Sequence, residues 1–379
     1  MSCPGSAGRS AGVAALGAMS VFGHLVYPAW LLVTTRNGSA PEPPVPESWP
    51  DVTVVIPAYR ERSVIADKVE DVLENGYPGS LQVVVVADDS ETASAARKTA
   101  ANVIESDARL GKAGAVDRGV REARGSVIVL TDANARLLPG SLAALARWFT
   151  DPTVGAVAGE KRVLDGGERL YWEFESWLKR RETRSGTTIG LVGELAAFDP
   201  HVYRPLPHDV LDDLWLVLDV VTAGRRIVYE PSAVALETGG SSLRDEWERR
   251  TRNVAGALDI FWRRRELLAP GRTPVTGQLW GHRVIRLSVG PLAHVALLLV
   301  AVRSLPRSRL AAGFCFAHLV GLSALARRAR GERVTNVERL LSQVLFFQAI
   351  GVGGTIRWLR RGPAGIWPKA ERVTSLPPA

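Results

Sequence analysis

The sequence predicts an α/β fold, an open and mostly parallel sheet flanked by helices, with transmembrane helices before and after it. Three observations support this prediction. Short β-branched runs alternate with helical stretches in the middle of the chain, charged residues concentrate there, and long apolar runs lie on either side. Alternating strands and helices favour a sheet that is covered by helices. A chain of 379 residues has room for about two or three domains, so it can hold both the α/β block and a membrane region.

The N-terminal segment, residues 1–39, is predicted to be a membrane anchor. No Asp, Glu, Lys or Arg occurs between Arg9 and Arg36, and a span needs about 20 apolar residues. A cleaved signal peptide is the alternative, because residues 38–40 could form a cleavage site. The apolar run is longer than the roughly 7–15 residues of a signal-peptide core, which favours the anchor. Residues 40–50 are rich in proline and predict a stiff linker.

The central block, residues 51–280, is predicted to hold the sheet. Continuous β-branched runs such as VTVVIP are typical of strands that are buried on both faces. The predicted strands are 52–57, 81–88 and 126–132, and the predicted helices are roughly 62–75, 91–102 and 112–124. In such sheets ligands bind beyond the carboxyl ends of the strands. The residues that follow each strand are therefore the candidate site.

Polar residues stand at these strand ends. Asp88 closes the second strand, and Asp132 and Asn134 close the third. In extended backbone, residues two apart point to the same side. A carboxylate and an amide oxygen together suit Mg²⁺ or Mn²⁺ that stays bound to substrate phosphates. The alternative is that Asp-x-Asn only forms a turn, a common use of both residues.

The order and spacing of these motifs resemble family 2 glycosyltransferases, inverting enzymes with a GT-A fold, over residues 52–270. VVIPAYRER is similar to the family's nucleotide-binding VVIPAYNEE segment, and LTDANA matches its metal-binding Asp-x-Asp position in the Asp-x-Asn form. The resemblance implies a nucleotide-sugar donor, a UDP-sugar in preference to a GDP-sugar, and a Mg²⁺ or Mn²⁺ ion at Asp132 and Asn134. The donor-binding residues predicted in this way are Ala58, Tyr59, Glu61, Asp88, Lys112, Asp132, Arg249 and Arg252.

The catalytic acids are predicted at Asp212 and Asp213, ahead of an apolar-periodic run. Acidic residues favour a helix N-terminus, which is a sufficient structural reason for the pair. The pair also resembles the family's two-acid motif, whose second member is the base. This resemblance implies that Asp213 takes the proton of the acceptor hydroxyl, with Asp212 orienting it. Gly193 and Glu194 lie in a segment that resembles the acceptor side of the family's site.

A cluster of arginines occurs in the segment DEWERRTRN. Guanidinium groups bind diphosphates bidentately, which suits Arg249 and Arg252 to the departing nucleotide. A helix facing anionic lipid is the alternative. The segment resembles the family's Gln-x-x-Arg-Trp motif only at Arg252. Because the Gln and Trp of processive polymer synthases are missing, a non-processive enzyme is expected.

The C-terminal region, residues 281–361, contains three apolar runs bounded by arginines, at 287–302, 310–326 and 340–356. Each run is short for a span, so two or three spans are expected. Arginines cluster beside these runs, which accounts for the net charge of +8 without nucleic-acid binding. We expect a multi-pass plasma-membrane protein with a cytoplasmic catalytic domain, a tail at 362–379, and a lipid, lipid-linked saccharide or polysaccharide acceptor.

Two other functions remain open on the sequence. A weakly active or inactive relative could act as a scaffold in an envelope-polysaccharide complex, because Asp-x-Asn replaces the usual motif. A nucleotidyltransferase fused to an anchor would need a Gly-rich basic loop after the first strand. The loop Ala58-Tyr59-Arg60-Glu61 contains no glycine, which disfavours that reading.

Overall fold

The computed structural model describes residues 4–36, 43, 45–106, 109–164, 169–238, 242–361 and 375–377. The chain divides into two compact units. The sheet unit consists of residues 34–241, 273–275 and 364–379. The helical unit consists of residues 1–33, 242–272 and 276–363. The segment 243–263, which lies in the central block of the sequence, therefore belongs to the helical unit.

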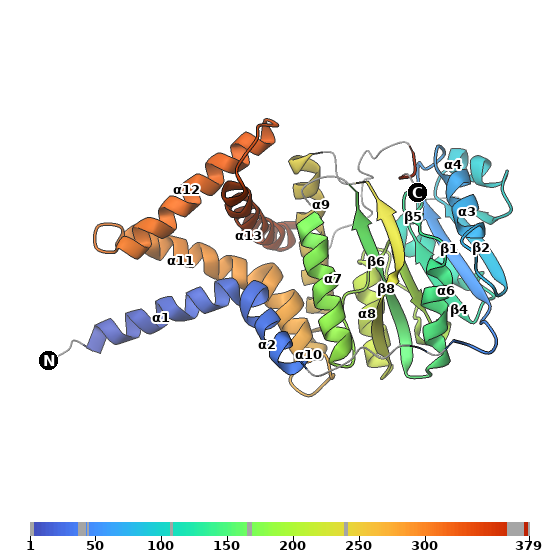
Figure 1. The fold of residues 1–379 in the computed structure, drawn as a ribbon, viewed down its shortest axis with the longest axis horizontal. Coiled ribbons are helices and arrows are strands. Elements are labelled where there is room, and N and C mark those ends of the chain that lie inside the picture. The colour runs from blue at the N-terminus through green and yellow to red at the C-terminus, as the bar shows by residue number, and fades with distance from the viewer. Residues whose placement is uncertain are drawn as a thin grey trace. The chain divides into compact units, whose positions relative to one another are not determined.

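An eight-stranded sheet forms the core of the sheet unit, with the strand order β3-β2-β1-β4-β7-β6-β8-β5 (Figure 1). Four of its seven pairings are parallel, and those of β7 with β4 and β6 and of β5 with β8 are antiparallel. The strands are β1 (Val52–Ala58), β2 (Leu81–Ala87), β3 (Asn102–Glu105), β4 (Val127–Thr131), β5 (Arg136–Leu137), β6 (Val154–Val163), β7 (Leu195–Phe198) and β8 (Arg226–Glu237). The predicted α/β sheet is confirmed.

The three predicted strands are β1, β2 and β4, and they lie side by side. Val52 of β1 pairs with Leu81 on one side and with Val127 on the other, all in parallel register. Their carboxyl ends therefore reach the same edge of the sheet, as the sequence predicted. The antiparallel strand β7 starts at this edge, because Leu195 pairs with Thr131 at the end of β4. The residues just before β7 are thereby placed beside those just after β4.

Helices cover both faces of the sheet. Side chains of α3, α4 and α6 pack in one core with those of the central strands, whereas α5 contacts the opposite face through Val55, Val84 and Val86. The helices α7 and α8 pack against β6 and β8. The helices of this unit are α3 (Ile65–Leu73), α4 (Ser90–Ala96), α5 (Gly111–Arg121), α6 (Ser141–Ala146), α7 (Arg169–Arg184) and α8 (Asp212–Thr222), with short 3₁₀ turns at η2 (Arg147–Thr150) and η3 (Pro200–Val202).

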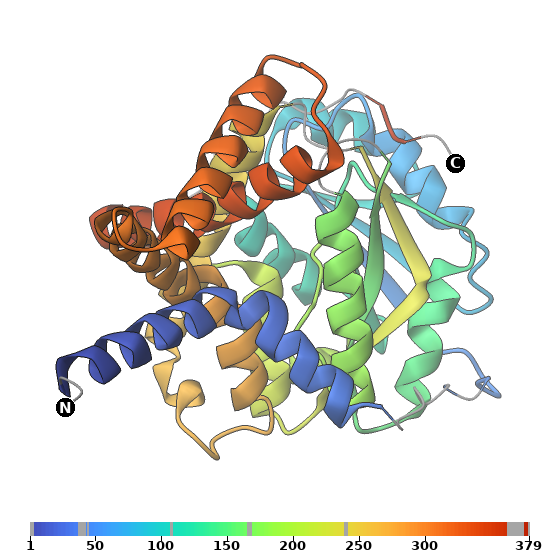
Figure 2. The ribbon, with the colours of Figure 1, turned by 60° about the vertical axis from the view of Figure 1, so that its left-hand side comes forward.

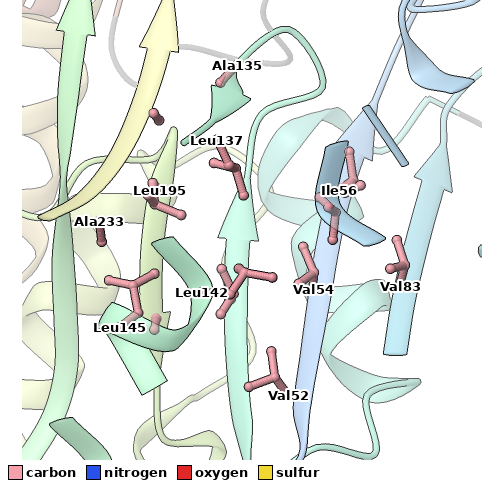
Figure 3. Close-up of a cluster of buried hydrophobic side chains, with 14 of the residues drawn as sticks. Val52, Val54, Ile56, Val83, Ala135, Leu137, Leu142, Leu145, Leu195 and Ala233 are labelled. Atoms are coloured by element: carbon pink, nitrogen blue, oxygen red, sulfur yellow. The ribbon is translucent and has the colours of Figure 1, made fainter. Parts of the chain in front are cut away.

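The larger core lies between the sheet and α3 and α6. Figure 3 shows Val54 and Ile56 of β1 among side chains that include Leu142 and Leu145 of α6, and all four are fully buried. Burying a side chain of this size contributes roughly 1.5–3 kcal/mol. This packing fixes the positions of the strands whose carboxyl ends carry the polar residues of the candidate site.

The helical unit contains four helical stretches that are long and apolar enough to cross a membrane, Ala11–Thr34, Thr276–Ser304, Arg309–Ala329 and Asn336–Arg360. Among the described residues, the three C-terminal stretches extend beyond the apolar runs at 287–302, 310–326 and 340–356, whereas the first lies within the uncharged run between Arg9 and Arg36. Within this unit α1 lies along α11, and α13 lies along α9 and α12 (Figure 2). The elements are α1 (Pro4–Val21), η1 (Phe22–Val26), α2 (Tyr27–Thr34), α9 (Leu243–Arg263), η4 (Arg265–Leu268), α10 (Thr276–Gln278), η5 (Leu279–Val289), α11 (Gly290–Ser304), α12 (Arg309–Ala329) and α13 (Asn336–Arg361).

Candidate active site

Three charged side chains from separate elements meet at the carboxyl edge of the sheet. The ammonium of Lys112, in the first turn of α5, lies 2.8 Å from Oδ1 of Asp132 and 3.5 Å from Oδ2 of Asp212. Asp132 follows β4, and Asp212 is the first residue of α8. The structure thus brings together residues that are up to 100 positions apart in sequence. We call Lys112, Asp132 and Asp212 the charged cluster.

Lys112 is held in this cluster as a cation. Burial by itself would lower the pKa of Lys112, but the carboxylates of Asp132, Asp212 and Glu194 outweigh burial and hold this pKa well above its usual value. Its Nζ also lies 3.5 Å from the carbonyl oxygen of Gly193. A Cβ atom at position 193 would come within 2.7 Å of that Nζ. A side chain at 193 would therefore push the ammonium from its present place, which glycine leaves open.

The ends of β1 and β2 are joined by a second group of contacts. The backbone N–H of Arg60 donates to Asp89 at 2.6 Å, and Arg60 has a positive φ of 56°. Asp89 also caps α4 by accepting from the N–H of Thr92 at 2.9 Å. The Thr92 hydroxyl accepts a bond from the N–H of Glu61. Because these bonds fix the loop backbone after β1, they set the positions of the predicted donor-binding residues there.

Asp88 holds the start of α5. Its Oδ2 accepts hydrogen bonds from the backbone N–H groups of Leu110 at 3.0 Å and Gly111 at 2.9 Å. Burial raises the pKa of Asp88, although these N–H groups act in the opposite direction. Gly111 has a φ of +71°, a conformation that glycine adopts readily. Asp88 therefore positions the turn that delivers Lys112 to the charged cluster.

An aromatic side chain lies at the same edge. The guanidinium carbon of Arg109 lies 4.3 Å from the centre of the Tyr59 ring, a cation–π distance. Ala58, the last residue of β1, accepts a hydrogen bond from the N–H of Asp88 through its carbonyl. The predicted donor-binding residues Ala58, Tyr59 and Asp88 are thus neighbours.

The two adjacent acids of α8 have different surroundings. Asp212 is buried and directed at Lys112, whereas Asp213 is half-buried and its Oδ1 accepts from the N–H of Leu214 at 2.7 Å. Both stand in the first turn of the helix, as the sequence predicted. The ion pair with Lys112 suits Asp212 to a positioning role.

The segment from Asp132 to Asn134 forms a turn, and the expectation of extended backbone was wrong. The N–H of Ala135 bonds to the carbonyl of Asp132, which closes the turn. Asn134 is buried, and its Nδ2 donates to Oε1 of Glu237 at 3.1 Å. Asp132 instead faces Lys112. The two residues therefore reach different partners although they are only two positions apart.

A buried ionic network stands next to this turn. The ammonium of Lys161, in β6, pairs with Glu194 at 2.5 Å and also contacts Glu237 closely. It lies 4.6 Å from the centre of the Trp172 ring. Burial would raise the pKa of Glu194, but Lys161 and Lys112 outweigh it and lower this pKa to about 2. Glu194 is thus a charged residue that links the network to the charged cluster.

The arginines predicted to bind the diphosphate do not belong to the sheet unit, which contains the charged cluster. Arg249 and Arg252 are on α9, in the helical unit. The neighbouring Arg250 is buried and pairs with Glu246 of the same helix at 2.8 Å. The role of Arg249 and Arg252 in donor binding stays a prediction.

The ligand types at this turn suit a hard divalent cation, although in this structure Asp132 faces Lys112 and Asn134 faces Glu237. Asp132 supplies a carboxylate and Asn134 an amide oxygen, and Mg²⁺ or Mn²⁺ takes its remaining oxygens from phosphates and water. Among the residues that the structure describes, no three His, Cys, Asp or Glu side chains form a cation cluster by themselves. A cation here would therefore share its coordination with substrate.

Three residues of the site were missed by reasoning from the sequence. Lys161 and Glu237 hold the network, and Lys68 of α3 donates to the carbonyl of Ala135 at 2.5 Å. Lys68 is fully buried, and burial lowers its pKa. The only signal in the sequence is a charged residue within or next to an apolar run, which does not say what it pairs with.

Comparison with known proteins defines the class of this site. The family description "Glycosyl transferase family 2" matches residues 53–215. An N-acetylglucosaminyltransferase of Mesorhizobium japonicum is 27% identical over 75% of this chain and 77% of its own length. A second N-acetylglucosaminyltransferase, from Rhizobium leguminosarum bv. viciae, is 26% identical over 56% of this chain and 58% of its own length.

A solved structure is similar over nearly the whole chain. A mannosyltransferase from Pyrobaculum calidifontis, in complex with GDP-Man and Mn²⁺, is 25% identical, with a TM-score of 0.74 over 93% of this chain and 99% of that one. The fold and the site thus define a glycosyltransferase with a GT-A-like sheet. Residues 53–215, which hold β2, β4, the charged cluster and all of β1 except Val52, form a glycosyltransferase family 2 domain.

Proposed function

We propose that this glycosyltransferase transfers a sugar, with inversion, from a nucleotide-sugar donor to a membrane-associated acceptor. The observation that carries the proposal is the charged cluster, in which Asp132, Lys112 and Asp212 meet where the loops after β1, β2 and β4 also converge. Opposite charges at one sheet edge suit a ligand that carries a diphosphate and a cation.

The donor is proposed to bind along this edge. Ala58, Tyr59, Glu61 and Asp88 surround the nucleoside, with the Tyr59 ring as a stacking surface. Asp132 and Asn134 hold Mg²⁺ or Mn²⁺, which neutralises the diphosphate when bound. The solved mannosyltransferase contains GDP-Man and Mn²⁺, which supports a metal-assisted diphosphate. A UDP-sugar, the preference drawn from the sequence, and a GDP-sugar are therefore the first donors to compare.

The transfer itself is a direct displacement. The acceptor hydroxyl oxygen attacks the anomeric carbon, the bond from that carbon to the donor phosphate oxygen breaks, and Asp213 accepts the hydroxyl proton. Asp212 holds Lys112 beside the departing diphosphate, and Arg249 and Arg252 add positive charge. Gly193 and Glu194, which precede β7 beside Asp132, form the acceptor side.

The acceptor is proposed to be a lipid, a lipid-linked saccharide or a polysaccharide. The four described helical stretches that are apolar enough to span a bilayer support a multi-pass membrane protein, and we place it in the plasma membrane as part of the proposal. A cytoplasmic catalytic domain is part of the same proposal, because positively charged residues flank the C-terminal helices. A non-processive reaction is expected because the Gln and Trp of polymer synthases are missing around Arg252.

The experiment is a screen of mass-tagged nucleotide sugars with purified protein and membrane lipid extract, run on wild type and on Asp213→Asn. We expect one donor to give a tagged product, and the variant to lose about 100- to 10,000-fold in rate while it binds nucleotide almost unchanged. Asp212→Asn is the matched comparison, in which donor binding also weakens. Near-full transfer by Asp213→Asn would rule out this residue as the base.

A further inference from the structure

The side-chain amide of Asn134 is oriented by Glu237. Its Nδ2 donates to Oε1 of Glu237 at 3.1 Å, in a buried place. An ionised carboxylate can only accept hydrogen bonds, so the amide nitrogen must face Glu237 and the amide oxygen must turn away from it. A carboxylate at position 134 would instead bring two negative charges together where water is excluded. The neighbourhood of Glu237 therefore favours an amide over a second acid.

Glu237 is paired with a buried ammonium, that of Lys161. The Lys161 ammonium is 2% exposed and pairs with both Glu237 and Glu194. The described side chains of this group, Lys161, Glu194, Glu237 and Asn134, carry one positive and two negative charges. Replacing Asn134 with an acid adds a negative charge, and neutralising Glu237 removes one. Making both changes restores the original charge balance.

Three side chains or segments from other elements contact the end of β4 and the turn after it. Glu237 is the last residue of β8, Glu194 lies beside the end of β4, and Lys68 holds the carbonyl of Ala135 from α3. The Thr131 hydroxyl donates to the carbonyl of Glu194 at 2.9 Å, which ties the two segments together. Glu237 itself is held by Lys161 and by its strand pairing with Val163, and the Asn134 amide is held by its bond to Glu237.

We propose that Glu237 is a positioning residue that presents the amide oxygen of Asn134 to the cation–diphosphate group, and that Lys161 keeps Glu237 in place for this task. The inference rests on the proposed cation site at Asp132 and Asn134. It adds that an asparagine at position 134 can serve as a cation ligand because Glu237 on β8 accepts a hydrogen bond from its amide nitrogen. Positions 134 and 237 are then coupled, so a change at one alters what is tolerated at the other.

The test is a double-substitution cycle with Asn134→Asp, Glu237→Gln and both together. Mn²⁺ affinity is measured by electron paramagnetic resonance in the presence of UDP and, separately, of GDP, together with the thermal unfolding midpoint. We expect each single substitution to weaken Mn²⁺ binding about tenfold or more. The pair should recover most of that loss, because the new amide at 237 donates to the new carboxylate at 134.

The outcomes separate this inference from the proposed function. If Asn134→Asp binds Mn²⁺ as tightly as wild type, or if the two effects simply add, Glu237 has no positioning role. Asp132→Ala is measured in parallel. Lost binding in that variant with additive effects at 134 and 237 contradicts only the inference, whereas unchanged binding contradicts the cation site as well.

A folding failure also gives a result. If Asn134→Asp does not fold, recovery of folding in the doubly substituted protein supports the coupling. If that protein does not fold either, Glu237→Gln decides alone, and an unchanged Mn²⁺ affinity in it overturns the inference.

Discussion

The Nζ of Lys112 lies 2.8 Å from Oδ1 of Asp132, so the start of α5 is bound to the end of β4 through an ion pair. The same ammonium lies 3.5 Å from Asp212 at the start of α8. One lysine thus links the proposed cation ligand to the proposed catalytic acids.

Lys112→Met should weaken donor binding by about 10- to 100-fold, because charge-assisted hydrogen bonds contribute roughly 1.5–3 kcal/mol. Calorimetric titration with UDP and GDP in the presence of Mn²⁺ measures this. Lys98→Met, which removes an exposed lysine, is the matched control and should bind as wild type does. Equal affinities in the two variants would remove Lys112 from the donor site.

Gly193→Ala should displace the Lys112 ammonium, because the added methyl carbon would come within 2.7 Å of it. A shift of about 1 Å in a positioned group can cost on the order of 100-fold in rate. Transfer rate and thermal midpoint are measured together. Gly313→Ala adds a methyl group where no atom lies within 4 Å and should be neutral. Full activity of Gly193→Ala would show that the ammonium position is not critical.

Asp132→Ala should weaken metal-dependent donor binding by at least about tenfold, since even changes to residues behind a metal ligand cost 10- to 100-fold. The readout is the Mn²⁺ concentration needed for half-maximal nucleotide binding. Asp67→Ala, at an exposed position on α3, should leave that concentration unchanged. An unaltered metal requirement in Asp132→Ala would discard the cation assignment.

Glu194→Gln should lower the thermal stability of the protein at neutral pH. It should also make that stability less dependent on pH. The pKa of Glu194 in the folded protein is about 2, below its ordinary value of 4.5. Its charge therefore stabilises the fold fully above about pH 4.5, and this contribution is lost as the pH falls toward 2.

The measurement is the thermal midpoint of wild type and variant between pH 7 and pH 3. We expect the variant to unfold at least about 4 °C lower at pH 7, a size that corresponds to roughly 1–2 kcal/mol. The two curves should converge as the solution is acidified. Parallel curves would show that Glu194 is not held charged by Lys161 and Lys112.

The sequence predicted the strands at Val52–Ala58, Leu81–Ala87 and Val127–Thr131 and the helix start at Asp212 with little error. These elements depend on local patterns, either a β-branched run or a pair of acids before an apolar face. At Asp132 to Asn134 the sequence left a turn and extended backbone as alternatives, because both suit those residues, and the structure has the turn. Its geometry depends on Lys68 and Glu237, which are far away in sequence.

The amino-acid sequence by itself determined the strands β1, β2 and β4, the strand ends that carry Asp88 and Asp132, and the resemblance to the family, because these follow from periodicity and motif spacing along the chain. Only the tertiary structure decided that Lys112 is the hub of the charged cluster and that Asn134 faces Glu237. Pairing of buried charges depends on distances in space, and here the start of α5 and the end of β8 both come close to the turn after β4. No local pattern in the sequence encodes which charge meets which.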